Sequence, residues 1–230
     1  MDRSQINAIM SEADAFFRAR GFLLPPFAYW TEADFRAHGA RAAGIVGSRL
    51  GWDITDFGLG NYDEMGLFLF TVRNGFVSDL AKGKGMLYAE KLMITKKDQH
   101  CPMHRHDLKA EDIINRGGGD LCLELFMSDA TGGIDREATV DVPTDGVMRT
   151  LPAGGILKLA PGESVTLMPG VWHHFWGEKA DVCVGEVSTV NDDVTDNVFE
   201  KPIGRFPTIV ENTAPLHLLV GDYERLGLVS

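Results

Sequence analysis

The feature that most constrains the fold is the alternation, from Leu67 onward, of short apolar runs with turn-forming residues. Glycine, proline, asparagine and aspartate interrupt the chain at short intervals, for example at Asn74-Gly75, at residues 117–120 and at Asp145-Gly146. Asn-Gly is a strong signal for a tight β-hairpin. Many short strands at this spacing are typical of a β-sandwich or barrel. The runs that we expect to form strands include residues 67–72, 87–95, 121–127, 165–168 and 182–190.

The beginning of the chain shows a helical pattern instead. After a candidate cap at Ser4, apolar side chains recur at helical spacing, and Gly21 supplies a stop. Thr31 and Asp34 have the spacing of a capping box for a second short helix that ends near Gly39. We therefore expect helices to precede the strands.

Together the two patterns predict a mainly β protein, with an N-terminal helical appendage over residues 1–60 and a β-barrel domain over residues 61–230. The appendage carries many aromatic side chains, and so much apolar surface must cover either the barrel or a partner subunit. We therefore expect a two-fold homodimer, which is the commonest closed arrangement. The aromatic residues concerned are Phe16, Phe17, Phe22, Phe27, Tyr29 and Trp30.

Charge and cysteine content narrow the class of protein. The chain has 22 Lys and Arg against 33 Asp and Glu, a formal net charge of −11. Such a surface repels phosphate backbones and anionic lipids, so we expect neither a nucleic-acid nor a membrane partner. No stretch approaches the roughly 20 apolar residues of a membrane-spanning helix. Cys101, Cys122 and Cys183 lie far apart, which favours a reducing compartment, and we expect a cytoplasmic protein.

The segment HRHDLKAE, residues 104–111, carries the candidate chemistry. On a strand, residues i and i+2 point to the same face, so His104 and His106 can present two imidazoles to one point. Glu111 follows closely enough to return a carboxylate to that point after a turn. By itself this pattern fits a structural role as well as a metal site.

A second segment, PGVWH at residues 169–173, favours the metal site. The two segments together resemble the two motifs of the cupin superfamily, in which a jelly-roll barrel takes two His and a Glu from the first motif and a third His from the second. The match departs from the usual pattern in the glycine after the Glu and in Pro-Gly where Pro-x-Gly is usual. His174 competes with His173, but a strand turns neighbouring side chains to opposite faces. The resemblance therefore implies four ligands for a divalent transition metal: His104, His106, Glu111 and His173.

Four more charged side chains are candidate participants. Lys109, inside the first motif, is either a solvated turn residue or a cation that polarises a substrate oxygen. Glu186 lies in an apolar run, where a buried carboxylate is costly unless it is paired or functional, and a half-exposed strand face is the alternative. Lys91 raises the same question on another strand. Asp193, in the polar strand end that begins at Asn191, either binds substrate hydroxyls or lies in an exposed turn.

Longer segments narrow the resemblance to one family. Residues 5–30 with their PPFAYW ending, residues 101–112, and GEVSTVNDD at residues 185–193 look like the D-lyxose isomerase family, and the likeness extends over nearly the whole chain. The resemblance implies a manganese-type ion in a cupin barrel that interconverts D-lyxose with D-xylulose, and commonly D-mannose with D-fructose. It also implies that Lys109 is a catalytic or substrate-binding residue. The roles of Glu186 and Lys91 rest on chemistry alone.

The expected function is metal-dependent aldose–ketose isomerisation through an enediol. We expect Mn²⁺, with Co²⁺, Fe²⁺ or Zn²⁺ as alternatives, and Glu186 as the catalytic base with Glu111 as its rival. Lys91 and Asp193 are expected to bind substrate. The acidic net charge, and the lack of an Arg or Lys cluster near the motifs, favour a neutral monosaccharide over a sugar phosphate. An iron cupin dioxygenase and a non-catalytic sugar-binding cupin are the two alternative functions.

Overall fold

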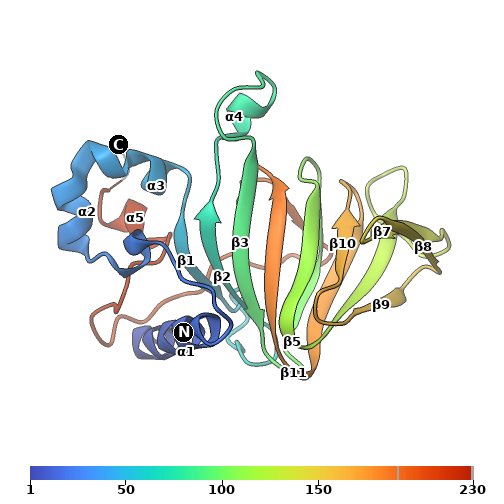
Figure 1. Cartoon of the computed structure of the whole chain (residues 1–230), viewed down its shortest axis with the longest axis horizontal. Helices are drawn as coiled ribbons and strands as arrows, with labels where there is room; N and C mark the ends of the chain where they lie inside the picture. Colours follow the sequence, from blue (N-terminus) through green and yellow to red (C-terminus); the bar gives the residue numbers. More distant parts are fainter. Residues whose placement is uncertain (191, 229–230) are drawn as a thin grey trace.

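A curved antiparallel sheet dominates the chain in the computed structural model, which describes residues 1–190 and 192–228 (Figure 1). The helices are α1 (Arg3–Arg18), α2 (Glu32–His38), α3 (Ala43–Gly47), α4 (Val77–Leu80) and α5 (Asp222–Arg225), with the 3-10 helices η1 (Pro26–Tyr29) and η2 (Gly39–Ala42). The strands are β1 (Gly51–Thr55), β2 (Leu67–Arg73), β3 (Tyr88–Thr95), β4 (His100–His106), β5 (Glu111–Ser128), β6 (Ile134–Asp135), β7 (Val140–Thr144), β8 (Val147–Leu151), β9 (Gly155–Leu159), β10 (Ser164–Leu167), β11 (Trp172–Thr189) and β12 (Asn197–Phe199). The expected mainly β fold with a helical N-terminal part is confirmed. Among the described residues, no helix is both long and apolar enough to cross a membrane.

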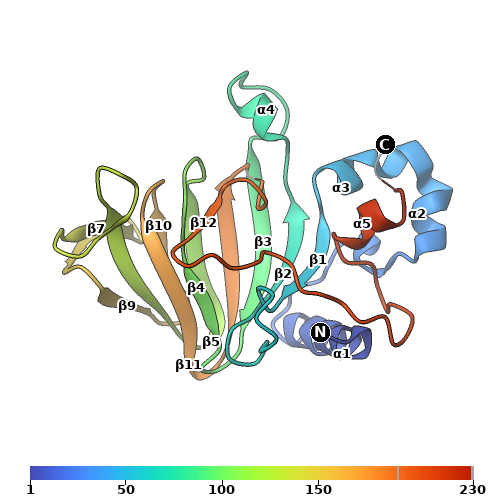
Figure 2. The same cartoon turned by 180° about the vertical axis from the view of Figure 1, so that it is seen from behind.

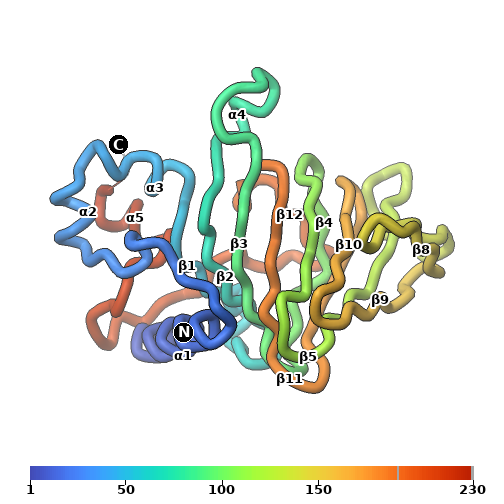
Figure 3. The backbone as a smooth tube through the Cα atoms, in the orientation of Figure 1, coloured from blue at the N-terminus to red at the C-terminus, as the bar shows by residue number. Residues whose placement is uncertain are grey.

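The strand order brings distant segments together. Along the main path the order is β1-β2-β3-β11-β4-β12, and β5 pairs with β11, β9, β10 and β6. β11 pairs with β3, β4 and β5, so it joins the two parts of the sheet. The strands lie side by side as a curled wall in the backbone trace (Figure 3). The concave face of this wall holds the larger apolar core and, next to it, a polar cavity.

The glycines at residues 117–120 do not end a strand, contrary to expectation. β5 continues through them, and the register of its pairing with β11 shifts there. Gly117 and Gly118 have φ angles of 129° and 110°, and a Cβ on Gly119 would lie 2.1 Å from the carbonyl oxygen of Glu178. These glycines therefore mark a bulge and a close approach of two backbones.

The predicted hairpin at Asn74-Gly75 and the predicted interruption at Asp145-Gly146 have different outcomes. Asp145 and Gly146 do separate two strands: they form a tight turn between β7 and β8, both with positive φ, as a type I′ turn requires. The Asn74-Gly75 prediction is wrong, because the connection between β2 and β3 spans residues 74–87 and contains α4. A Cβ on Gly75 would lie 1.9 Å from the carbonyl oxygen of Met86, so this glycine lets the two ends of a longer loop meet.

The N-terminal helices pack on the outer face of the same sheet. Phe17 of α1 is fully buried in a cluster with Trp52 of β1 and Phe68 of β2. The other aromatic side chains of the first 30 residues are partly buried in this cluster or in a neighbouring one that contains Trp30. Because the chain itself covers these rings, their number no longer argues for a partner subunit.

Two helix starts were predicted from capping residues, and one of the two predictions is confirmed. Thr31 and Asp34 make both hydrogen bonds of the predicted capping box at the start of α2. Ser4 is not a cap, because α1 already begins at Arg3. β1 lies inside the range 1–60 that we expected to form the appendage, so the first strand of the sheet precedes the expected domain boundary. That boundary stays a prediction.

The C-terminal segment runs from β12 across the back of the barrel to the N-terminal helices (Figure 2). The terminal ammonium of Met1 donates to the carbonyl oxygen of Thr208 at 2.7 Å. The fully buried guanidinium of Arg3 contacts Glu211 at 2.7 Å and Asp222 at 2.9 Å. These contacts fix the C-terminal segment against α1.

Candidate active site

Strand pairing brings three imidazoles together on the concave face. His104 of β4 lies directly opposite His173 of β11 in the ladder, and His106 is two residues along the same strand. One ligand nitrogen from each of the three lies within 4.8 Å of the others, and all three side chains are buried. The group could therefore hold a divalent metal ion.

Backbone carbonyls fix the orientation of each ring. Nδ1 of His104 lies 2.7 Å from Pro102 O, Nδ1 of His106 lies 3.2 Å from Asp196 O, and Nδ1 of His173 lies 3.1 Å from Val171 O. A carbonyl oxygen only accepts, so each Nδ1 must donate its proton and each Nε2 keeps its lone pair. Burial is the main cause that lowers the pKa of His104 and of His106, and it favours the neutral, ligating form.

The carboxylate of Glu111 faces these lone pairs. Glu111 Oε1 lies 3.2 Å from His173 Nε2 and 3.5 Å from His106 Nε2. Oε1 of Glu111 and Nε2 of His106 are buried and find no hydrogen-bond partner within residues 1–190 and 192–228. Acceptors that face one another in a buried space repel unless a cation lies between them. The donor set of three imidazole nitrogens and one carboxylate oxygen therefore fits a divalent transition metal.

A chain of ion pairs extends from Glu111 along the cavity. Lys109 Nζ lies 2.6 Å from Glu111 and 3.1 Å from Glu186. Lys91 Nζ lies 3.2 Å from the same oxygen of Glu186 and 2.9 Å from Asp193. In the ladder, Glu186 of β11 lies directly opposite Lys91 of β3. The four charged side chains singled out from the sequence thus meet in one cavity.

Burial and charge act in opposite directions on these groups. Burial alone would lower the pKa of Lys109, but the carboxylates of Glu111 and Glu186 outweigh it and raise the pKa above its usual range. Burial alone would raise the pKa of Asp193, but Lys91 and Arg205 outweigh it and hold the pKa below its usual range. Lys109 is therefore a cation and Asp193 an anion at neutral pH.

Two further residues of the site, Asp196 and Arg205, were not found from the sequence. The carboxylate of Asp196 accepts hydrogen bonds from three successive backbone amides, residues 107–109, at 2.9–3.0 Å, so it holds the turn that carries Lys109. Arg205 lines the cavity and contacts Asp53 at 2.6 Å and Asp193 at 3.7 Å. Arg205 lies in a tail rich in Pro and Gly, and no local pattern links it to the motifs.

The expectation that no Arg or Lys cluster lies near the motifs is wrong. Lys91, Lys109 and Arg205 all line the cavity. Each of them is paired, however, because the four carboxylates of Asp53, Glu111, Glu186 and Asp193 contact them. The cations are already compensated, so the cavity suits a neutral ligand better than a phosphate.

His174 lies on the opposite face of β11 from His173. Its Nε2 is 2.8 Å from His100 Nδ1, and its Nδ1 is 3.4 Å from a carboxylate oxygen of Glu124. It does not belong to the three-histidine group.

The polar strand end that begins at Asn191 is described only in part. Asp193 lies beside Lys91, whereas Asn191 lies outside the described residues.

The curled antiparallel sheet, with buried His, Glu and Lys side chains gathered on its concave face, has the architecture of a cupin-like fold. Solved structures share this fold. The L-ribose isomerase of Cellulomonas parahominis, determined with L-psicose, superposes with a TM-score of 0.63 at 16% identity, covering 91% of this chain and 98% of that one. The Acinetobacter sp. DL28 L-ribose isomerase in complex with L-ribose gives a TM-score of 0.58 at 15% identity, covering 90% and 98%.

Sequence comparison narrows the assignment further. The family model described as D-lyxose isomerase matches residues 1–223, so this chain belongs to the D-lyxose isomerase family. The D-lyxose/D-mannose isomerase of Serratia proteamaculans is 44% identical over 228 residues, covering 98% of this chain and 99% of the relative. That of Escherichia coli O157:H7 is 41% identical over the same shares. The resemblance stated from the motifs is confirmed, and the dioxygenase and the non-catalytic cupin are set aside.

Proposed function

We propose that the protein interconverts D-lyxose with D-xylulose, and D-mannose with D-fructose, through an enediol. The two relatives at 44% and 41% identity are both named D-lyxose/D-mannose isomerases. The observation that carries the proposal is the continuous contact from Glu111 through Lys109 to Glu186 beside the three imidazoles. It brings two carboxylates and one ammonium to the place where a carbonyl and a hydroxyl would bind.

His104, His106, Glu111 and His173 are the proposed metal ligands, with Mn²⁺ as the proposed ion and Co²⁺, Fe²⁺ or Zn²⁺ as alternatives. A bound divalent cation would hold two neighbouring oxygens of an open-chain sugar and stabilise the negative charge that develops on them. The fixed Nδ1 donors support this assignment, because they leave three Nε2 atoms aimed at one point. The buried, unpaired Glu111 Oε1 supports the fourth position.

The isomerisation moves one proton between C1 and C2 and another between O1 and O2. In the proposal Glu186 removes and returns the carbon-bound proton, a role usually worth about 10² to 10⁴ in rate. Lys109 and Lys91 both contact Glu186 Oε1 and orient its carboxylate. Lys109, whose pKa is raised, stabilises the developing negative charge on the sugar oxygen. Glu111 is the rival base, but Lys109 and the imidazoles occupy its surroundings.

One assay tests this function. Metal-depleted protein, with Mn²⁺ restored, is incubated with D-lyxose, D-mannose or D-ribose while ketose is measured. We expect ketose from D-lyxose and D-mannose, and none from the metal-depleted protein or from His106→Ala. Ketose formation that is unaffected by metal removal would refute the metal assignment. Oxygen consumption with Fe²⁺ and no ketose with any metal would refute the isomerase proposal.

We also propose a cytoplasmic homodimer. Exposed apolar side chains on β8 and β9 support a protein interface, because Val147, Met148 and Ile156 are each more than half exposed. A two-fold arrangement would cover the same surface on both copies. Sedimentation at micromolar concentration should give twice the mass of 25.2 kDa, and Met148→Glu should shift the protein toward the monomer. A wild-type monomer would refute the dimer.

A further inference from the structure

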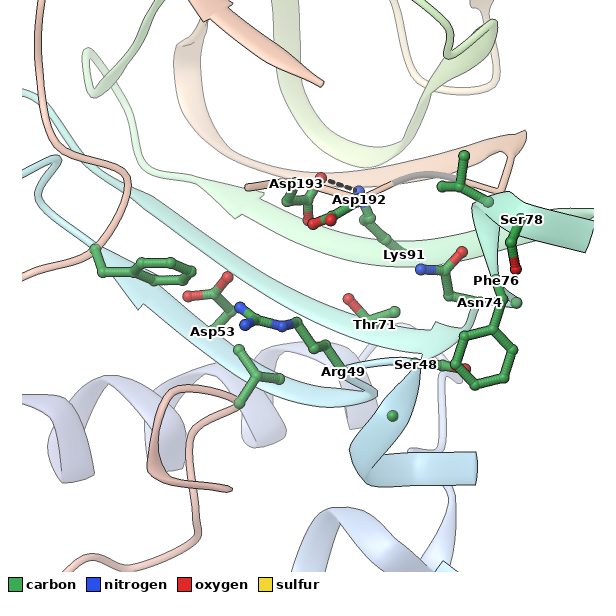
Figure 4. Close-up of a pocket in the computed structure, with 15 residues that line it drawn as sticks. Ser48, Arg49, Asp53, Thr71, Asn74, Phe76, Ser78, Lys91, Asp192 and Asp193 are labelled. Carbon is green, nitrogen blue, oxygen red and sulfur yellow. Dashed lines mark hydrogen bonds and ion pairs between the residues drawn. The ribbon is translucent and has the colours of Figure 1, made fainter. Parts of the chain in front are cut away.

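We call the cavity that holds His104, His106, Glu111 and His173 the metal cavity. A second cavity lies beside it, where β2 ends, β3 begins and β11 ends (Figure 4). We call it the outer chamber. Its free volume is about 270 Å³, against about 40 Å³ for the metal cavity on the same measure. Lys91 and Asp193 line both spaces and form the wall between them. The remaining side chains that define the outer chamber include Ser48, Arg49, Asp53, Thr71, Asn74, Phe76, Ser78 and Phe206.

The outer chamber continues the inner face of the sheet. Thr71 of β2 lies directly opposite Lys91 of β3, and Lys91 lies opposite Glu186 of β11. Opposite residues in a ladder share a face, so a row of inward-pointing side chains leads from the chamber to the metal cavity. A molecule in the chamber is therefore separated from Glu186 by Lys91 and its partner Asp193.

The metal cavity is too small to receive a whole sugar from solution as it stands. A buried water needs roughly 10–15 Å³ on this kind of measure, so the metal cavity has room for about three waters. All of its metal-ligand side chains are buried, and the most exposed of them, His104, is only 8% accessible. The larger outer chamber can hold a monosaccharide ring.

The lining of the outer chamber has the chemistry of a sugar site. Phe76 and Phe206 are 48% and 38% exposed, so their rings offer apolar faces to a ligand. Thr71, Asn74 and Ser78 add hydroxyl and amide groups (Figure 4). Small-molecule sites combine aromatic surface with a few placed polar groups in this way.

Arg49 adds a cationic donor to the lining of the outer chamber. Its φ of 51° is that of the residue after the end of α3, where Leu50 N donates to Ile45 O and Arg49 N donates to Val46 O. Its guanidinium lies in the chamber near Asp53 (Figure 4). Within residues 1–190 and 192–228 its guanidinium takes part in no ion pair of 4.0 Å or less, whereas Arg205 is paired with Asp53. Arg49 thus presents a guanidinium with no direct ion-pair partner among the described residues to this space.

We propose that the outer chamber binds the sugar in its cyclic form, as a pyranose, before the open chain reaches the metal cavity. This inference rests on the proposed function, because it takes the substrate to be a free aldose. Aldoses in water are mainly rings, whereas the metal cavity accepts two adjacent oxygens of an open chain. The chamber supplies the space and the hydrogen-bonding groups for the ring, and the Lys91–Asp193 pair lies where the sugar passes inward.

A locked ring tests the site without catalysis. Methyl α-D-mannopyranoside cannot open, so it can occupy the chamber but cannot present an open-chain carbonyl to the metal cavity. We expect saturation-transfer NMR to detect its binding to the metal-depleted protein, and equally to His106→Ala. Ser78→Trp, which fills the chamber from the exposed loop, should weaken this binding by about tenfold or more, equivalent to 1.4 kcal/mol. Ala81→Trp, on the same loop but outside the chamber lining, is the matched control and should bind like the wild type.

Kinetics give the second readout. Ser78→Trp should lower kcat/KM for D-mannose by about tenfold while kcat stays within about twofold, because only entry is impaired. The locked glycoside should inhibit the wild type competitively. The proposal is overturned if the glycoside does not bind, if it binds only with metal present, or if Ser78→Trp binds it as well as Ala81→Trp does. Failure of the proposed function has a different signature, since no ketose would form from any wild-type preparation whatever the glycoside does.

Discussion

Replacing Glu186 by Gln should remove the base and leave the metal cavity assembled. The amide is close in size to the carboxylate, and its oxygen can still accept the hydrogen bond that Lys109 donates at 3.1 Å. Both lysines keep a second carboxylate, since Lys109 lies 2.6 Å from Glu111 and Lys91 lies 2.9 Å from Asp193. We therefore expect the metal content of Glu186→Gln to match that of the wild type.

The effects on rate and on stability should differ in size. Loss of a general base lowers the rate by about 10² to 10⁴, which is about 2.7–5.5 kcal/mol of transition-state stabilisation. Two lysines contact Glu186, at 3.1 and 3.2 Å, and in the variant their acceptor changes from a charged carboxylate to a neutral amide. Each change costs about 1 kcal/mol, so unfolding should become easier by about 2 kcal/mol, or about 4–8 °C in Tm.

Proton NMR in D₂O measures the proton transfer directly. During conversion of the aldose, the wild type should place deuterium at C1 of the ketose, because the enediol route exchanges the C2 proton with solvent. Glu186→Gln should give neither ketose nor exchange. Glu124→Gln, on the outer face beside His174, is the control and should behave like the wild type. Full retention of the C2 hydrogen in the ketose would refute the enediol route, and wild-type exchange in Glu186→Gln would transfer the role of base to another group.

Three further predictions concern the metal and the fold. His173→Ala should lower the metal content by about tenfold or more, whereas His174→Ala should keep the wild-type content. Elemental analysis of the purified variants measures this. Loss of metal in His174→Ala but not in His173→Ala would make His174 the ligand. Chelation of a metal present at about 100 times its Kd should reduce stability by about 2.7 kcal/mol, and calorimetry that shows no change in Tm would argue against a metal bound in the folded state. Arg3→Met leaves the buried carboxylate of Asp222 with the backbone amide of Leu219 and the half-exposed Arg225 as partners, so denaturant unfolding should show a loss of about 3 kcal/mol. Arg3 also holds the pKa of Glu211 below its usual range, and a lowered folded-state pKa contributes stability that is lost as the pH falls below about 4.5. The same variant should therefore flatten the acid side of the stability–pH curve, and an unchanged curve would contradict this coupling.

Local rules of the sequence predicted the parts of the site that lie close together along the chain. Side-chain alternation on a strand places His104 and His106 on one face, and it turns His174 away from the face of His173. The Thr31–Asp34 spacing gave the start of α2. The glycines at residues 117–120 were misjudged, because a bulge inside a long strand and a turn between two strands use the same residues.

The remaining part of the site depends on the curled sheet. Which histidine faces His104, and which lysine faces Glu186, is set by the register of β11 against β4 and β3. Arg205 reaches Asp53 from 152 residues away, and Asp196 holds the Lys109 turn from 87 residues away. No periodicity extends over such distances, because the pairing register and the curl of the sheet result from the packing of the whole core. The sequence determined the family and the motif that carries the proposed metal ligands. Only the tertiary structure determined that Lys91, Lys109 and Arg205 each have a carboxylate partner in the cavity. The reason is that charges far apart along the chain become neighbours only when the sheet curls.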